Sequence, residues 1–449
     1  MPAGRVRTDA ATRFVHECDA LMLFRESPLA VVYAESTAEV ADAMRVLAEL
    51  NLPVVARGAG TGLAGGARPC CDGVVLELSK MDSILDLDVE GFSMRVEAGV
   101  VNAAVSAAAA PHGLFFAPDP SSQIASTIGG NIATGAGGPH CLRYGTTTDH
   151  VRAVTLVDVC GVVHEITDES LLSLVIGSEG TLGIVTEAVL GLLPIPEATA
   201  TLLLDFPTME EACACVTEVL SAGLVPAALE ILDQRAVAAV EESLFAAGFP
   251  RDAAAVLLAE VDGTAAEAEE AARFFEERWS ARRSRTEDER AKWWRGRKGA
   301  FGAMGRIGEE CYVMDGVVPR GKMAEAIRRV HAAAEQRGLP CVNVFHAGDG
   351  NLHPLLGYSR DQTDAVAAAG REIAAICVEL GGTLTGEHGI GVEKREFMPL
   401  LFDEASLAAM ERVRHAFDPK RRLNPGKLLP GPKVCAEAIR RKDAERVVG

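Results

Sequence analysis

The sequence lacks the features that mark a nucleic-acid-binding protein, a disulfide scaffold or an iron–sulfur protein. Its 44 lysine and arginine residues are outnumbered by 63 aspartate and glutamate residues, which leaves a formal net charge of −19. Such a charge repels nucleic acid and anionic membrane surfaces, so neither is expected as a general partner. The 11 cysteines include no CxxC motif, which argues against both a disulfide framework and a cluster held by this chain.

The sequence also lacks an apolar run that could cross a membrane. A stretch without a formal charge, residues 98–118, has the length of a membrane span but is interrupted by Asn102, Pro111 and Gly113, so we expect an alanine-rich helix followed by a loop. Residues 1–9 contain no apolar core of a secretory signal, which predicts a cytoplasmic protein. Peripheral attachment to the inner face of a membrane, through a partner, stays open.

The composition that remains is that of a globular protein. Of the 449 residues, 48% are hydrophobic and 24% are charged, so the length allows two or three domains with sizeable cores. In the second half, we expect helices over 208–222, 265–298, 322–336, 361–380 and 404–416, and strands over 254–260, 312–319 and 341–345. The highly charged run 265–298 is interpreted as one long helix with a solvated face.

Three glycine-rich loops occupy residues 57–66, 117–138 and 176–186. Loops of this kind let backbone amides approach anionic oxygens such as those of a pyrophosphate. Any one of them could be a structural turn, but three loops flanked by expected strands predict a nucleotide cofactor. The first loop formally matches GxGxxG, yet a strand over 74–78 rather than a helix follows it, which argues against a Rossmann-type NAD site.

Two short glycine-flanked motifs bring together residues that commonly bind divalent metals. One motif supplies His346 and His353, and the other supplies Glu387 and His388. Two imidazoles and one carboxylate form a common set for Zn²⁺ or a similar ion, with positions left open for a substrate. Adjacent side chains of an extended backbone point to opposite sides, so we expect Glu387 to bind the ion and His388 to act as a general base. Unconnected loop histidines are the alternative.

A cation at the end of the charged run is a candidate for holding a substrate carboxylate. Arg297 and Lys298 both lie there, and arginine offers the planar fork that matches a carboxylate. An exposed cation at a helix end is the alternative. Beside such a clamp, a bound metal would lower the pKa of a substrate hydroxyl.

Seven motifs follow one another in a familiar order over nearly the whole chain. They are Arg57–Gly62, Ala117–Gln123, Thr127–Asn131, His140–Gly145, Ile176–Gly180, Asn343–Asn351 and Gly386–Gly391. Together they resemble the FAD-linked 2-hydroxyacid dehydrogenases of the vanillyl-alcohol-oxidase (VAO)/PCMH type. This family includes glycolate oxidase flavin subunits, D-lactate dehydrogenases and D-2-hydroxyglutarate dehydrogenases, and the first two are the most similar.

The resemblance implies a two-domain α+β fold. Residues 1–24 would form an N-terminal segment, and residues 25–197 a PCMH-type FAD-binding domain. Residues 198–403 would form an α+β cap of ferredoxin-like type that binds substrate and metal. The segment 404–449 would return to the FAD domain.

The resemblance also assigns roles to individual residues. The metal, Zn or Fe, falls to His346, His353 and Glu387, the base to His388 and the carboxylate clamp to Arg297. The predicted FAD-binding residues are Arg57, Gly58, Ala59, Gly60, Thr61, Gly62, Pro118, Asp119, Ser121, Ser122, Gly129, Gly130, Ile184 and Asn424. The first glycine loop contains no histidine for a covalent link, so non-covalent FAD is expected.

The activity implied is oxidation of a small 2-hydroxy acid, with hydride transfer to flavin N5. Dicarboxylate-specific relatives use polar residues after the clamp, where the spacing gives Phe301 and Tyr312 in this chain, which favours D-lactate or glycolate. Electrons would pass to an iron–sulfur subunit, an electron-transfer flavoprotein or a quinone. The alternatives are a D-2-hydroxyglutarate dehydrogenase, an electron-transferring flavoprotein subunit with a vestigial site, and a flavin-free metallohydrolase.

Overall fold

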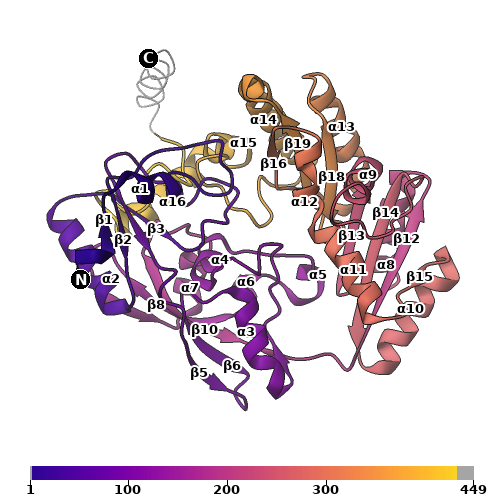
Figure 1. The fold of residues 1–449 in the computed structure, drawn as a ribbon, viewed down its shortest axis with the longest axis horizontal. Helices are drawn as coiled ribbons and strands as arrows, with labels where there is room; N and C mark the ends of the chain where they lie inside the picture. The colour runs from indigo at the N-terminus through magenta and orange to yellow at the C-terminus, as the bar shows by residue number, and fades with distance from the viewer. Residues whose placement is uncertain (1–2, 432–449) are drawn as a thin grey trace.

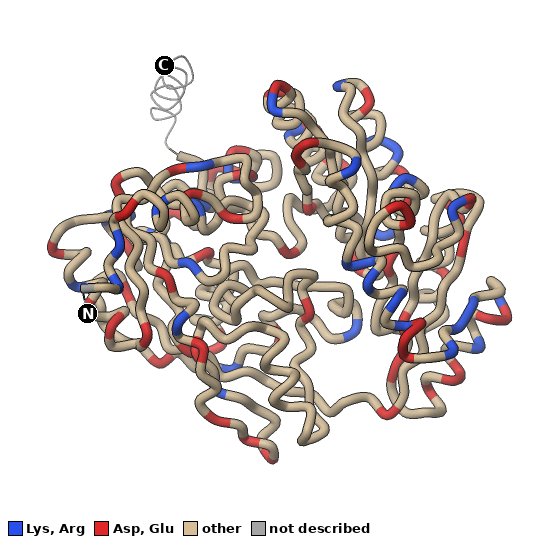
Figure 2. The backbone as a smooth tube through the Cα atoms, viewed as in Figure 1, with Lys and Arg blue, Asp and Glu red and all other residues tan. Residues whose placement is uncertain are grey.

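The computed structural model describes residues 3–431, which form two lobes (Figure 1). The predicted segments 1–24 and 404–449 therefore extend at their outer ends beyond the described residues. Acidic and basic residues interleave along the backbone of both lobes (Figure 2). None of the described helices is both long and apolar enough to span a membrane.

The first lobe begins with a four-stranded sheet in the order β1-β2-β4-β3. Its strands are β1 Val6–Arg7, β2 Ala30–Tyr33, β3 Val54–Arg57 and β4 Val74–Glu77, and α2 Thr37–Glu49 connects β2 to β3. The strands β2, β4 and β3 are parallel and rich in valine, as expected for strands that are covered on both faces. The first glycine loop leaves the end of β3 and leads into β4.

A second sheet of five antiparallel strands, in the order β5-β6-β10-β8-β9, completes the first lobe. The strands are β5 Ile84–Asp88, β6 Ser93–Glu97, β8 Val151–Val157, β9 Val163–Ile166 and β10 Ile184–Gly191, and α3 Asn102–Ala109 and α4 Ile128–Thr134 pack beside them. The expected alanine-rich helix in the uncharged stretch is therefore confirmed as α3. The third glycine loop leads directly into β10.

The cap is built on one eight-stranded sheet in the order β15-β12-β14-β13-β18-β19-β16, with β17 paired to β19. Its strands are β12 Ala198–Phe206, β13 Ala228–Asp233, β14 Ala255–Gly263, β15 Arg282–Arg283, β16 Glu310–Val313, β17 Gly316–Val317, β18 Cys341–His346 and β19 Asn351–Tyr358. All of these pairings are antiparallel.

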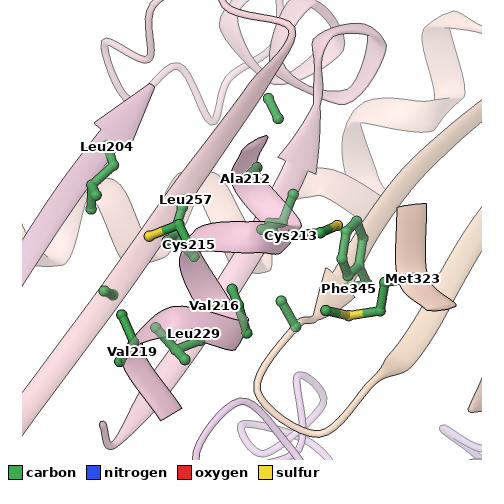
Figure 3. Packing of buried hydrophobic residues seen from close by; sticks show 14 of the residues in the cluster. Leu204, Ala212, Cys213, Cys215, Val216, Val219, Leu229, Leu257, Met323 and Phe345 are labelled. Atoms are coloured by element: carbon green, nitrogen blue, oxygen red, sulfur yellow. The ribbon is translucent and has the colours of Figure 1, made fainter. Parts of the chain in front are cut away.

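Helices cover both faces of the cap sheet. The helices α8 Met209–Ser221, α10 Ala265–Trp279 and α13 Met323–Glu335 pack on one face, and α9 Gln234–Glu241, α11 Glu287–Lys298 and α12 Ala300–Ala303 pack on the other. Alternate residues of β14 serve the two cores, because Leu257 joins the first core and Leu258 the second. Figure 3 shows Leu257 packed against α8 in the first core.

Two predicted elements are wrong in detail. The long helix expected over 265–298 is two helices, because α10 ends at Trp279, the next residue Ser280 has a left-handed φ of 55°, and β15 then pairs with β12. The strand expected over 312–319 is interrupted between β16 and β17, where Asp315 is fully buried. Both breaks shape the site, since the first starts the helix that carries Arg297 and the second frees Asp315 from the sheet.

The chain returns to the first lobe after the cap, where residues 422–424 run beside β3. Leu423 forms a parallel bridge with Val54, and the backbone N–H of Asn424 donates to the Val54 carbonyl (2.8 Å). The remaining elements are α1 Ala10–Val15, β7 Leu114–Phe115, α5 Cys141–Tyr144, α6 Thr147–His150, α7 Glu169–Val175, β11 Leu193–Pro194, α14 Thr363–Glu379, α15 Met398–Leu401 and α16 Glu404–Phe417.

The cap core makes a stability prediction. Leu257 is fully buried in the centre of the sheet, so Leu257→Ala should lower the free energy of unfolding of the cap by about 2–5 kcal/mol through lost burial and a cavity. Leu244, which is 98% exposed, is the control, and Leu244→Ala should change stability by no more than about 0.5 kcal/mol. Urea unfolding of the two variants measures the difference, and equal effects would contradict the core described.

Candidate active site

A cavity of about 680 Å³ lies between the first lobe and the cap. All three glycine loops contribute to its wall from one side, and cap residues from α11, α12, β18 and β19 contribute from the other. A volume of this size is typical of cofactor and substrate pockets.

The cavity wall contains all of the predicted FAD-binding residues except Pro118 and Asp119. It includes Arg57, Gly58, Ala59, Gly60, Thr61, Gly62, Ser121, Ser122, Gly129, Gly130, Ile184 and Asn424. The Pro118 carbonyl instead accepts a hydrogen bond from Asn102 Nδ2 (3.1 Å). The Asp119 carboxylate pairs with His140 Nδ1 (2.9 Å) and with Lys298 Nζ of the cap (3.1 Å), so it joins the lobes rather than lining the cavity.

The first-lobe part of the wall fits a polar, anionic cofactor. Gly60 has a left-handed φ of 69°, which favours glycine. Next to Gly62 there is space, because the nearest atom to an added Cβ is Asp19 Oδ2 at 3.6 Å. Asn131 lines the cavity, and its buried Nδ2 has no hydrogen-bond partner. A bound polar group would satisfy that donor.

The register of three cap strands places two of the predicted metal ligands, His346 and His353, side by side. Glu230 of β13 lies opposite His346 of β18, and Val344 of β18 lies opposite His353 of β19. Residues opposite one another in antiparallel strands share a face, and so do residues two apart in one strand. Glu230, His346 and His353 therefore lie on the same face of the sheet, beside the apolar core that Val344 joins.

The donor set of His346, His353 and Glu387 fits a divalent metal. Glu387 Oε1 lies 3.3 Å from His346 Nε2 and 3.1 Å from His353 Nε2, and one ligand atom of each of the three lies within 4.8 Å of the others. His346 Nδ1 lies 2.7 Å from Glu230 Oε1. When Nδ1 donates its proton to Glu230, Nε2 presents a lone pair toward Glu387, and a cation between them satisfies both.

The protonation of these groups follows from the same contacts. Burial lowers the pKa of His346, but the carboxylates of Glu230 and Glu387 raise it well above its ordinary value. Burial raises the pKa of Glu387, but hydrogen bonds from His346 and His353 hold it well below its ordinary value. A metal ion would take the place of the proton that these groups share.

The loop that carries Glu387 and His388 is held by the buried carboxylate of Asp315. Asp315 accepts hydrogen bonds from the backbone N–H groups of Gly386 (3.1 Å), Glu387 (3.2 Å) and His388 (2.8 Å). The Lys394 ammonium lies 3.3 Å from the same carboxylate. Burial raises the pKa of Asp315, but its cationic neighbours lower it overall, so the group stays ionised.

A second buried carboxylate attaches this loop to the first lobe. Glu179 lies in the third glycine loop, where its own φ is 53°. Its oxygens accept hydrogen bonds from the backbone N–H groups of Ile390 (2.6 Å) and Gly391 (2.8 Å). The Glu179 carbonyl also accepts a hydrogen bond from Asn424 Nδ2 (2.6 Å). The glycine loop, the metal-ligand loop and the returning C-terminal segment therefore meet at one residue.

The expectation that Glu387 and His388 point to opposite sides is wrong. Both side chains line the cavity, and His388 Nε2 lies 3.9 Å from Glu387 Oε1. The backbone here is not extended, since residues 386–388 form a bend. The His388 ring stacks on His353 with 5.1 Å between centroids. Burial lowers the pKa of His388 to about 4, so the ring is neutral at pH 7 and can accept a proton.

Of the two candidate cations, Arg297 is the one beside the metal ligands. It is 5% exposed and lines the cavity, and its Nη2 forms an ion pair with Glu230. Its Nε is buried without a partner. Lys298 also lines the cavity, but it is already paired with Asp119. Arg297 is therefore not the exposed helix-end cation that the alternative interpretation describes.

The wall around Arg297 is apolar. Val313, Val344, Leu355 and Phe301 line it. Tyr312, expected by spacing to face the substrate, is instead buried in a core on the opposite side of its strand. The next residue of the strand, Val313, lines the cavity instead, because consecutive residues of a strand point to opposite faces.

Comparisons with known proteins identify the family of this chain. Residues 28–167 match the family described as FAD binding domain, and residues 195–428 match FAD linked oxidases, C-terminal domain. The chain belongs to the FAD-linked oxidase family. Glycolate oxidase subunit GlcD of Escherichia coli K12 is 40% identical over 438 residues, which cover 94% of this chain and 88% of that protein. A D-lactate dehydrogenase of Archaeoglobus fulgidus is 35% identical over 418 residues, covering 89% and 91%.

Solved structures place this FAD-linked oxidase in the predicted fold class. The structure of p-cresol methylhydroxylase with substrate bound matches with a TM-score of 0.79 at 16% identity, covering 94% of this chain and 93% of that chain. At this identity the likeness shows the fold alone. The predicted α+β PCMH-type fold is confirmed.

Three carboxylates that organise the site of this FAD-linked oxidase, Glu230, Asp315 and Glu179, were not among the predicted site residues. The sequence carries a signal for two of them. Glu230 is an acid within Ala-Ala-Leu-Glu-Ile-Leu, and Asp315 follows Tyr-Val-Met. An acidic residue inside an apolar run indicates a buried charge that must have a partner.

The donor set of this FAD-linked oxidase makes a metal-binding prediction. Glu387→Gln removes the charged ligand between His346 and His353, so the purified variant should hold at least about tenfold less Zn or Fe than the wild type. Elemental analysis after dialysis measures this. Glu393, a buried acid on the same segment that no metal-ligand group contains, is the control, and Glu393→Gln should retain metal. Unchanged metal in Glu387→Gln would remove it from the ligand set.

Proposed function

We propose that this FAD-linked oxidase oxidises a small 2-hydroxy acid, D-lactate or glycolate, to the corresponding 2-oxo acid. The observation that carries the proposal is that Arg297, His388, His353 and Glu387 all line the same cavity as the glycine loops. The names of the relatives, a glycolate oxidase subunit and a D-lactate dehydrogenase, support the same substrate class.

Each of these residues has a different role in the proposed reaction. Arg297 binds the substrate carboxylate, and neutral His388 accepts the hydroxyl proton. A Zn or Fe ion held by His346, His353 and Glu387 would polarise the substrate oxygens and lower the pKa of the hydroxyl. Bound FAD supplies the acceptor for the Cα hydride. Loss of one proton and one hydride converts the hydroxyl-bearing carbon to a carbonyl, so the reaction balances.

The cavity favours a monocarboxylate. The wall beside Arg297 is apolar at Phe301, Val313 and Leu355, and a second substrate carboxylate there would lose its hydration without gaining a partner. Lys298 cannot serve freely, because Asp119 already holds it. These features support lactate or glycolate over 2-hydroxyglutarate.

The cofactor is proposed to be dissociable. Among the described residues that line the cavity, the histidines are His353 and His388, both of which belong to the cap site, and neither cysteine nor tyrosine occurs there. The flavin side of the wall therefore offers none of these side chains for a covalent link. Reduced flavin would pass electrons to a separate iron–sulfur subunit, an electron-transfer flavoprotein or a quinone, consistent with the absence of CxxC from the chain.

An anaerobic titration tests the proposed reaction. The flavin of the purified protein should lose its visible absorbance on mixing with D-lactate or glycolate, and should respond little to L-lactate or D-2-hydroxyglutarate. Absorbance is recorded after each addition. Bleaching by D-2-hydroxyglutarate instead would contradict the monocarboxylate assignment and direct attention to Arg295, an exposed cation on the cavity wall. A flavin that none of these acids bleaches would reject the proposed substrate class.

The role of the base makes a separate prediction. His388→Asn removes the proton acceptor but no predicted FAD contact, so turnover should fall about 10²–10⁴-fold while FAD content stays at the wild-type level. Flavin absorbance after gel filtration and the rate of flavin reduction give the two readouts. His164, an exposed residue paired with Asp158, provides the control, and His164→Asn should react at the wild-type rate. Reduction of the His388→Asn flavin at that rate would reject the assignment.

A further inference from the structure

Glu230 is a buried carboxylate that has no step in the proposed reaction. It is 0% exposed on β13. Its Oε1 and Oε2 lie 2.7 and 2.9 Å from His346 Nδ1, and Oε2 forms an ion pair with Arg297 Nη2. Arg297 Nη2 itself lies 3.4 Å from His346 Nδ1. The three side chains form one cluster behind the cavity wall.

Stability alone gives little reason for a carboxylate at this place. Removing its charge from water is costly, and the attraction of a buried partner offsets that cost only in part. The residues two positions away in the strand, Ala228 and Leu232, lie on the same face as Glu230 and are buried apolar residues, so an apolar side chain would suit this face of the sheet. What distinguishes Glu230 is that both of its partners belong to the proposed reaction.

We infer that Glu230 is a positioning residue that holds a metal ligand and the substrate clamp in one unit. This inference deepens the proposed function and rests on it. Glu230 does not line the cavity wall, and it contacts His346 at Nδ1, not at the Nε2 atom that would bind the metal. It therefore acts through His346 and Arg297.

The contact with His346 selects the tautomer that can bind a metal. With its proton on Nδ1 and donated to Glu230, the ring has its lone pair on Nε2, the nitrogen that faces Glu387. A carboxylate behind a metal-binding histidine fixes the ring orientation and makes the ligand nitrogen more basic. Glu230 is in place to do both.

The contact with Arg297 aims the guanidinium and balances its charge. Nη2 is held by Glu230, whereas Nε is buried without a partner, so part of the fork remains for a ligand. The charges of Arg297 and Glu230 cancel, and a divalent ion together with Glu387 leaves one positive charge. One positive charge suits one substrate carboxylate, in agreement with a monocarboxylic substrate.

The test is metal affinity, which needs no turnover. Glu230→Gln keeps the size of the side chain but removes its charge and presents a donor to Arg297. Zn²⁺ affinity is measured in the FAD-loaded, substrate-free protein by competition with a chromogenic chelator. We expect the variant to bind Zn²⁺ about 10–100-fold more weakly than the wild type, while it keeps its FAD.

Glu260 offers a matched control. It is also a buried carboxylate of the cap sheet, 2% exposed on β14, and it bonds to Arg290 and Trp294 rather than to the metal ligands. Glu260→Gln should therefore lower thermal stability but leave Zn²⁺ affinity at the wild-type value. Equal loss of Zn²⁺ affinity in both variants would show a general effect of losing a buried charge and would overturn the inference.

A double variant separates positioning from a purely structural ion pair. Glu230→Leu combined with Arg297→Met removes both charges together, which a folded core tolerates far better than removal of one. The double variant should fold with FAD bound and still bind Zn²⁺ at least tenfold more weakly, since His346 has lost its partner. Wild-type Zn²⁺ affinity in the folded double variant, or in Glu230→Gln, would overturn the inference.

The outcome also distinguishes this inference from the proposed function. A wild-type protein that binds no Zn²⁺ at all would remove the metal from the proposed function, and the positioning role would fall with it. If the wild type binds Zn²⁺ and Glu230→Gln binds it with the same affinity, only the positioning role is overturned. Glu230→Asp, which keeps the charge on a shorter side chain, should show an intermediate loss of affinity.

Discussion

Buried carboxylates that must find partners are the constraint on which the active-site wall depends. Glu230, Asp315 and Glu179 are each shielded from water, and an unpaired charge in such a place would not be tolerated. Each finds its partners far along the chain, Glu230 at β18 and α11, and the other two in the loop that follows α14. The positions of the proposed ligands, clamp and base are therefore set by pairing in the core rather than by their own loops.

The two lobes contribute different chemistry to the cavity, and charged contacts hold them in register. The first lobe offers mostly glycine-loop backbone, whereas the cap offers histidines, a carboxylate and arginine. His140 joins them, because it pairs with Asp119 in its own lobe and with Glu260 of the cap. Burial lowers the pKa of His140, but these two carboxylates raise it to about 10, so the contact persists at neutral pH.

Local patterns in the sequence predicted most of the elements and the candidate ligands. His346, His353, Glu387 and His388 lie in short motifs whose chemistry can be read without knowing the fold. What could not be predicted depends on contacts distant in sequence or on the parity of a strand. Glu230 meets His346 only because β13 pairs with β18. Val313 rather than the expected Tyr312 faces the cavity, because consecutive residues of a strand point to opposite faces.

The break in the expected helix 265–298 also depends on a contact that is distant in sequence. A uniform charged run from 265 to 298 looks like one helix, but the sheet gains an edge strand when the chain leaves the helix at Ser280 and pairs Arg283 with Leu202. Helix α11 then starts afresh with Thr286 as its cap, and its last turn places Arg297 against Glu230. The break between α10 and α11 therefore sets the direction of the helix that carries Arg297.

The attachment of the 386–391 loop to both lobes has a consequence for the proposed base. Asp315 fixes the loop to the cap at His388, and Glu179 fixes it to the third glycine loop two residues later. Any movement of the cap that separated His388 from the first lobe would have to break hydrogen bonds to a buried carboxylate. The base, together with the metal ligand Glu387 in the same loop, is thus held in a defined position relative to the glycine loops that we propose bind the flavin, while the cap sheet holds the other two proposed ligands, His346 and His353.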